Sequence, residues 1–282
     1  MKHIVKVAKT GTLFSSTINL TNTIIGSGVL GLPYAIAQSG LVTGLLLLMG
    51  SALAAAFGLY LLVQCSNILS RRSNENPSYY SCAQATYPSA SALIDFVVFI
   101  KCFGVATSYL NVIGDYMPDV IGAILGLAPE DPLPENLYAT SRFWIIISAF
   151  LIVPLCFLKQ LHSLRFTSGL SLITVGYLLA LVVTYFFMEG IPIKDDIGIA
   201  PFNGATFLEV MTIFVFGFTC HQNVFSIYNE LIDPTPKRIN FVIFASIGSA
   251  FGVYLIIALL GYLTYGIAVD SNIINNCKFN LI

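Results

Sequence analysis

Seven long apolar segments run along the chain, and polar stretches separate them. They cover approximately residues 13–37, 41–66, 92–115, 142–158, 168–188, 206–229 and 240–266. About 20 apolar residues in a helix span the hydrocarbon core of a bilayer, and backbone polar groups cannot stay unpaired there. The pattern therefore predicts an all-α membrane protein with a single transmembrane domain over residues 1–282.

Composition supports a lipid environment. Apolar residues make up 56% of the chain and charged residues only 10%, whereas soluble domains carry about 25% charged residues. The net charge is −1 and no basic cluster occurs, so we expect no nucleic-acid partner. The six cysteines form no CxxC pair, and no catalytic triad, phosphate-binding loop or paired-carboxylate site is evident. We therefore expect neither an enzyme nor a bound metal or cofactor.

The distribution of Lys and Arg predicts the orientation, because cytosolic loops carry an excess of these residues. If the N-terminus is cytosolic, nine of them fall on the cytosolic side: Lys2, Lys6, Lys9, Arg71, Arg72, Lys159, Arg165, Lys237 and Arg238. The opposite side then holds only Arg142, Lys194 and Lys278, while Lys101 falls within the third segment. We expect a cytosolic N-terminus.

Two of the apolar segments are interrupted in the middle. The stretch "TNTIIGSGVLGLPYA", residues 21–35, carries Gly26, Gly28 and Gly31 and then Pro33, which removes a backbone donor. The sixth segment contains "FVFGFTCHQNVFSIYNEL", residues 214–231, with polar residues at membrane depth. Glycine also permits close packing of membrane helices, which is the alternative explanation for the first stretch.

Interrupted helices at the first and sixth positions are typical of inverted-repeat transporters. This design predicts a first five-helix repeat over 12–188 and the first two helices of a second, incomplete repeat over 206–266. Amides at an unwound helix suit a carboxylate, and freed carbonyls suit an ammonium group or a cation. The expected ligand is an amino acid, bound by Thr23, Gly26, Ser27, Gly28, Phe216, Gly217, Phe218 and Thr219, with Tyr109 of the third segment as a possible cap.

Several motifs also resemble one family, the amino acid/auxin permeases. "NLTNTIIGSGVLGLPYAIAQSG" resembles the first helix of that family, "IVPLCFLKQLHSLRFTS" its fourth helix with the following loop, and "FGFTCHQNVFSIYNEL" its sixth. "GYLTYGIAVDSNIINN" resembles the exit of its seventh helix. The resemblance runs from about residue 12 to 276. Within the family, "TCHQNVFSIYNEL" looks most like vacuolar amino-acid exporters of fungi, followed by sodium-coupled neutral amino-acid transporters.

The resemblance implies a LeuT-type fold and secondary active transport driven by a proton or sodium gradient. The family has eleven transmembrane helices and this chain offers seven, so we expect a fragment or a truncated gene model. By resemblance, the carbonyls of Asn22 and Ile25 face a cation site. His221 suits a proton sensor. The alternatives are ordinary hydrogen bonds within the bundle for Asn22 and His221, and packing against the first helix for Tyr109.

Two other functions remain open at this stage. One is a seven-helix receptor, although the predicted cytosolic N-terminus argues against it. The other is a sensor that binds an amino acid without moving it. We expect a vacuolar or lysosomal membrane, with the plasma membrane as the alternative, and neither the substrate's identity nor the coupling ion follows from the sequence.

Overall fold

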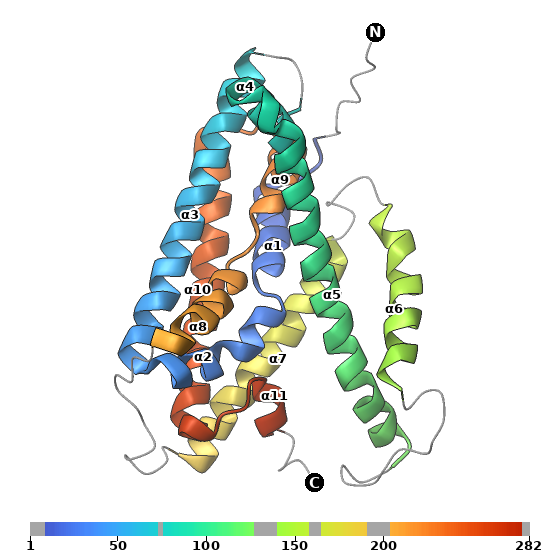
Figure 1. Cartoon of the computed structure of the whole chain (residues 1–282), viewed down its shortest axis with the longest axis vertical. Coiled ribbons are helices and arrows are strands. Elements are labelled where there is room, and N and C mark those ends of the chain that lie inside the picture. The colour runs from blue at the N-terminus through green and yellow to red at the C-terminus, as the bar shows by residue number, and fades with distance from the viewer. Residues whose placement is uncertain (1–8, 73–75, 127–139, 158–164, 191–203, 278–282) are drawn as a thin grey trace. The chain divides into compact units, whose positions relative to one another are not determined.

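The computed structural model describes residues 9–72, 76–126, 140–157, 165–190 and 204–277 (Figure 1). Within these ranges the secondary structure is helical, apart from one isolated parallel bridge between Gly11 and Leu231. The α-helices are α1 (Leu13–Ile24), α2 (Leu32–Ser39), α3 (Leu41–Arg72), α4 (Tyr79–Thr86), α5 (Ser91–Ile124), α6 (Ser141–Cys156), α7 (Arg165–Glu189), α8 (Gly204–Gly217), α9 (Val224–Glu230), α10 (Pro236–Tyr265) and α11 (Ile273–Asn276). Short 3₁₀ helices are η1 (Ser27–Gly31), η2 (Pro88–Ala90), η6 (His221–Asn223) and η7 (Gly266–Ala268).

The prediction of an all-α membrane protein is confirmed. Among the described residues, five helical stretches are long and apolar enough to cross a membrane, and the bent pair α1 and α2 makes a sixth. The apolar part of α6, Ser141–Pro154, is shorter than these. Large apolar side chains such as Phe150 and Phe187 are about 80% and 78% exposed, respectively. An outer surface of this kind is stable only where lipid is the solvent.

The helix starts follow local capping chemistry. Thr12 precedes α1 and forms a capping box with Ser15, which satisfies two otherwise unpaired backbone groups. At the start of α10 the side chain of Thr235 accepts a hydrogen bond from the Arg238 amide, and Pro236 occupies the first helical position. These caps start α1 and α10 at fixed residues before the apolar segments that follow.

The chain forms two compact units, residues 1–82 with 160–282 and residues 83–159. In the first unit α10 packs against α1, α2, α3 and α7 around a buried apolar core. The largest fully buried side chains in that core include Tyr254, Tyr262, Phe214 and Phe218. In the second unit α5 packs against α6, where a Cβ at Gly114 would lie 2.8 Å from Cγ1 of Ile145. The division into repeats at 12–188 and 206–266 stays a prediction.

The two interrupted helices run antiparallel within the first unit. The part of the first helix before its break, α1, contacts the part of the sixth segment after its break, α9. Conversely, α2 and η1 after the first break contact α8 before the second. Figure 1 shows the two breaks at a similar height along the unit. This arrangement brings together two stretches of irregular backbone that lie almost 200 residues apart in the sequence.

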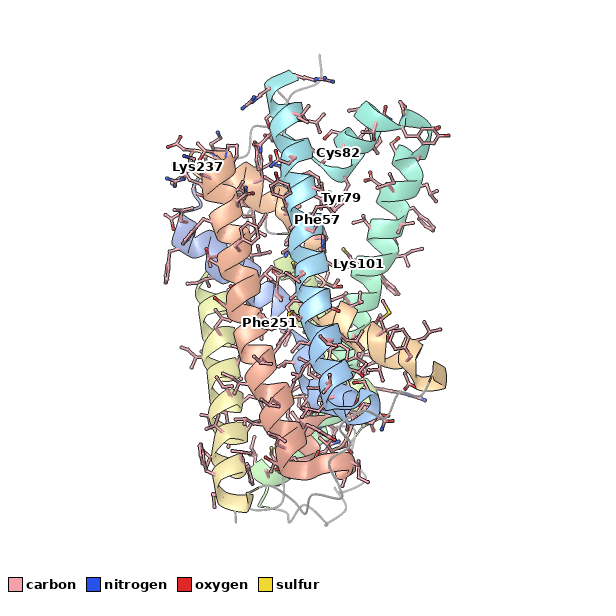
Figure 2. The ribbon with its side chains drawn as sticks, turned by 90° about the vertical axis from the view of Figure 1, so that its left-hand side faces the viewer. Phe57, Tyr79, Cys82, Lys101, Lys237 and Phe251 are labelled. Atoms are coloured by element: carbon pink, nitrogen blue, oxygen red, sulfur yellow. The ribbon has the colours of Figure 1, made fainter. Side chains whose placement is uncertain are left out.

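Positive charge gathers at one end of the same unit. The end of α3, with Arg71 and Arg72 in its last turn, and the start of α10, with Lys237, lie at the same end (Figure 2). The residues before α1 join this end through the bridge between Gly11 and Leu231, in which the Gly11 amide donates to the Glu230 carbonyl at 2.8 Å.

Candidate functional site

The first break lies at Ile25 and Gly26, between α1 and η1. The helix axis bends by 48° there. Ile25 still donates to the Thr21 carbonyl at 2.8 Å, but its ψ of 80° takes the chain out of the helix. Gly26 follows in an extended conformation, and its amide turns back to the Ile24 carbonyl at 2.8 Å. The chain re-enters a helix only at Ser27, where η1 begins.

The second break covers Phe218 to Cys220, between α8 and η6. The Thr219 amide donates to the Phe216 carbonyl and the Asn223 amide to the Cys220 carbonyl, both at 3.0 Å. Within the described residues, the carbonyls of Phe218 and Thr219 have no hydrogen-bond donor. Such groups are costly in hydrocarbon unless they face a polar ligand or water. This break therefore offers two acceptors at the predicted position.

Glycines bring the two breaks into backbone contact. A Cβ built on Gly28 would lie 3.0 Å from the Gly217 Cα and 3.3 Å from Cδ1 of Phe216. Any residue other than glycine at position 28 would therefore push η1 away from α8. The described residues also contain no acceptor for the Gly28 amide. The first break thus offers one donor and the second break two acceptors.

A side-chain hydrogen bond links the same two segments. The Asn223 amide nitrogen donates to the Thr23 hydroxyl at 2.9 Å. The Thr23 hydroxyl in turn donates to the Asn19 carbonyl at 2.9 Å, one turn earlier in α1. Thr23 was predicted as a substrate contact; in this structure its oxygen is engaged by Asn223.

A tyrosine from α10 forms hydrogen bonds to both breaks. The Tyr254 hydroxyl hydrogen-bonds to the Gly217 carbonyl at 2.9 Å and also to the Ile24 carbonyl. These carbonyls belong to the last residues of α8 and α1, immediately before the breaks. The Tyr254 side chain is fully buried and packs edge to face against Phe218, with ring centroids 5.2 Å apart. Sequence reasoning did not identify Tyr254, because a single tyrosine in an apolar helix gives no signal of its partners.

A cavity of about 490 Å³ adjoins the second break on the side of α3. Phe218, Thr219 and His221 line it together with apolar residues of α3 and α8. His221 lies against α3, because a Cβ at Gly58 would lie 2.7 Å from its Nε2 atom. Ile25 and Gly26 of the first break are not among the residues that line this cavity.

The short helix α4 rests on the second break. The Tyr79 hydroxyl donates to the His221 carbonyl at 2.8 Å, and its ring packs edge to face against Phe225 with ring centroids 4.8 Å apart. In the same helix, burial and the neighbouring Cys65 thiol raise the pKa of the Cys82 thiol to about 11. α4 therefore contributes the Tyr79 hydroxyl to the surroundings of His221.

The structure brings together most of the predicted site. Gly28, Gly217 and Thr23 lie at the contacts between the two broken helices, and Gly26 and Ser27 belong to the same backbone stretch as Gly28. The Oδ1 atom of Asn22, predicted to lie at a cation site, is buried and has no hydrogen-bond partner. Tyr109 lies on α5 in the second unit and is 39% exposed there. Its predicted role next to the substrate stays a prediction, as do the roles of the other site residues.

Antiparallel broken helices within a bundle of membrane-spanning helices are typical of secondary transporters. Comparison with known proteins agrees with this class. The family model described as "Transmembrane amino acid transporter protein" matches residues 9–282. The chain therefore belongs to the transmembrane amino acid transporter family, as the resemblance implied, and this is not a family of enzymes.

Individual relatives are similar over nearly all of the chain. Vacuolar amino acid transporter 5 of Schizosaccharomyces pombe is 41% identical over 96% of this chain, and vacuolar amino acid transporter 7 of Saccharomyces cerevisiae is 34% identical over 97%. A putative sodium-coupled neutral amino acid transporter 11 of Danio rerio is 32% identical over 93%. The chain covers 62%, 54% and 57% of the lengths of these proteins, respectively.

Proposed function

We propose that the chain carries the substrate-binding part of a secondary active amino-acid transporter. The observation that supports this most strongly is the contact between the two breaks through Gly28 and Gly217. The contact supports the proposal because a backbone donor, the Gly28 amide, and two backbone acceptors, the Phe218 and Thr219 carbonyls, belong to the two stretches that meet there. A zwitterion needs both kinds of group within a few ångströms, whereas lipid can use neither. Family membership favours this function over a receptor.

The proposed substrate lies between the broken helices. Its carboxylate accepts hydrogen bonds from the amides of Ser27 and Gly28, where the positive end of the helix dipole of η1 and α2 adds to the attraction, whereas the Gly26 amide keeps its bond to the Ile24 carbonyl. Its ammonium group donates to carbonyls of the stretch 216–219. The Phe218 and Thr219 carbonyls support this role, because neither has a donor among the described residues.

The proposed coupling ion is a proton or Na⁺. Asn22 supports a cation next to the first break, because its Oδ1 atom is buried without a partner, and buried polar oxygens normally have one. The Ile25 carbonyl is the second proposed ligand. His221 supports the proton instead, since it lies next to the second break and titrates near neutral pH when unperturbed. The named relatives include both vacuolar and sodium-coupled transporters.

The experiment is uptake by the reconstituted chain. Purified chain in liposomes is given a mixture of ¹⁴C-labelled L-amino acids, under an imposed pH gradient, an imposed Na⁺ gradient or neither. We expect gradient-driven accumulation that exceeds the amount in empty liposomes. No accumulation under either gradient, together with no equilibrium binding, would contradict the proposal. Binding without accumulation would support the amino-acid sensor instead.

Two asparagine variants distinguish the loss of an ion site from a general loss of transport caused by removing a buried asparagine. Asn22→Leu is expected to remove the dependence on the driving ion and to lower accumulation at least several-fold. Asn240→Leu is the matched control, because Asn240 also has a buried Oδ1 atom without a partner but lies near the start of α10. Equal loss in both variants would argue against an ion site at Asn22.

A further inference from the structure

One tyrosine on a third helix joins the two breaks. The hydroxyl of Tyr254 on α10 hydrogen-bonds to the last carbonyl of α1, Ile24, and to the last carbonyl of α8, Gly217. The side chain is fully buried, and its Cε2 atom would lie 3.4 Å from a Cβ at Gly217. The hydroxyl therefore sits where the carbonyl ends of two half-helices converge.

The Ile24 and Gly217 carbonyls differ in how many hydrogen-bond donors they have. A tyrosine hydroxyl has a single proton to donate, so Ile24 and Gly217 share it. The Ile24 carbonyl also accepts from the Gly26 amide at 2.8 Å. Among the described residues, Tyr254 is the only donor to the Gly217 carbonyl. Loss or displacement of the Tyr254 hydroxyl would thus affect Gly217 far more than Ile24.

Two carbonyl ends that converge at low dielectric attract positive charge. The negative ends of α1 and α8 add their dipoles at this point, and a charged donor binds a carbonyl more strongly than a neutral hydroxyl does. An ammonium group brings three protons, enough for Gly217 and for the unpaired carbonyls of Phe218 and Thr219 next to it.

We propose that Tyr254 is a positioning residue: its hydroxyl holds the two breaks together in the empty site and yields the Gly217 carbonyl to the ammonium group of the substrate. The inference rests on the proposed function. In the empty state the hydroxyl satisfies both carbonyls and keeps the half-helices in register. When the substrate binds, its ammonium group takes over Gly217, and Tyr254 keeps its bond to Ile24.

The test is Tyr254→Phe in the reconstituted chain, with uptake of the ¹⁴C-labelled amino-acid mixture measured against concentration. Without the competing hydroxyl, the substrate should bind more tightly, and KM should fall about 2- to 10-fold, the range expected for one net hydrogen bond. Vmax should also fall, because the empty site loses the group that restores its register. A KM that rises or stays unchanged would overturn the proposal, since a purely structural defect does not tighten binding.

Tyr185→Phe is the matched control. The Tyr185 side chain is also buried and its hydroxyl donates to a backbone carbonyl, that of Cys277, at 3.0 Å, which belongs to neither break. We expect its KM to stay within twofold of the unsubstituted chain. A fall in KM in this control equal to that of Tyr254→Phe would overturn the assignment to Tyr254.

Hydrogen–deuterium exchange in lipid nanodiscs tests the link without any substrate. Tyr254→Phe should speed exchange in peptides covering residues 25–29 and 218–223 together, whereas Tyr185→Phe should change neither. Unchanged exchange at either break would refute the link. If the unsubstituted chain neither binds nor transports amino acids, the proposed function fails, and so does the proposed transfer of the Gly217 carbonyl from Tyr254 to the ammonium group. The exchange experiment still decides whether Tyr254 joins the two breaks.

Discussion

At the residue scale, Gly28 is the position of the site with the least room for a side chain. In Gly28→Ala the new methyl group would lie 3.0 Å from the Gly217 Cα and 3.4 Å from the Gly217 nitrogen, and backbone atoms cannot move aside cheaply. We expect a loss of about 1–3 kcal/mol in stability, the usual range for overpacking. A lower midpoint of thermal unfolding in detergent would show it.

The control for this substitution is Gly248→Ala on α10. A Cβ there would meet no atom within 4 Å, and alanine is the better helix former. We expect an unchanged or slightly higher midpoint. Equal midpoints for Gly28→Ala and Gly248→Ala would mean that the two breaks are not in close contact.

A second prediction at this scale concerns Cys82. Burial, followed by the nearby Cys65 thiol, raises the Cys82 pKa to about 11. Only the thiolate reacts with alkylating reagents, so at pH 8 Cys82 should react about 100-fold more slowly than a solvated thiol of ordinary pKa. Mass spectrometry of iodoacetamide-treated protein gives the rate, which should rise about ninefold between pH 9 and pH 10. A rise of less than about twofold over this interval would show an ordinary pKa.

The contrast between Gly28 and Tyr254 shows what sequence can reveal at this scale. Gly28 was predicted because glycine and proline within an apolar segment contradict the local requirement for a continuous helix. Tyr254 satisfies every local rule for a membrane helix, and its two acceptors lie 230 and 37 residues away in the sequence. Its role depends on tertiary packing alone, which composition and periodicity do not encode.

At the scale of elements, the hydrogen bond between Asn223 and Thr23 should couple the two broken helices. The variants Thr23→Val, Asn223→Leu and the double variant form a thermodynamic cycle. We expect a coupling energy of about 0.6 kcal/mol, the average for polar contacts between membrane helices. Stability is measured by SDS titration in mixed micelles.

A cycle of Thr23→Val with Ser249→Ala is the control, because the Ser249 hydroxyl donates to the Ala245 carbonyl within its own helix. The control cycle should be additive, and additivity in both cycles would contradict the link.

Helix lengths were the less predictable property of the elements. The second apolar segment was expected to end near residue 66, but α3 continues to Arg72, and α5 continues to Ile124 instead of ending near 115. Hydropathy detects only the part of a helix that lies in hydrocarbon. Beyond it, polar residues such as Arg71 and Arg72 remain compatible with helix, because no glycine or proline ends α3 before residue 72. Pro118 lies inside α5 and does not end it.

At the scale of the whole molecule, the sequence predicted two broken helices five segments apart, and the structure shows both breaks and their contact. That success has a simple cause: a membrane-spanning segment must be helical unless its backbone is paired otherwise, so each exception in the sequence is informative. Which carbonyls face a ligand and which are taken by Tyr254 could not be predicted, since both kinds of carbonyl belong to the same unwound stretch.

The orientation in the membrane is the last prediction. Arg71, Arg72 and Lys237 lie at the same end of the first unit as the bridge between Gly11 and Leu231 (Figure 2). Positive loops remain on the cytosolic side, so an epitope tag at residue 2 should be accessible to antibody once the plasma membrane alone is permeabilised, with the vacuolar membrane still intact. The triple variant Arg71→Gln, Arg72→Gln and Lys237→Gln should increase the fraction of inverted molecules. Arg142→Gln, which removes a charge predicted on the opposite side, should not. A tag that is exposed on the outer or lumenal face of the unsubstituted chain would contradict the orientation.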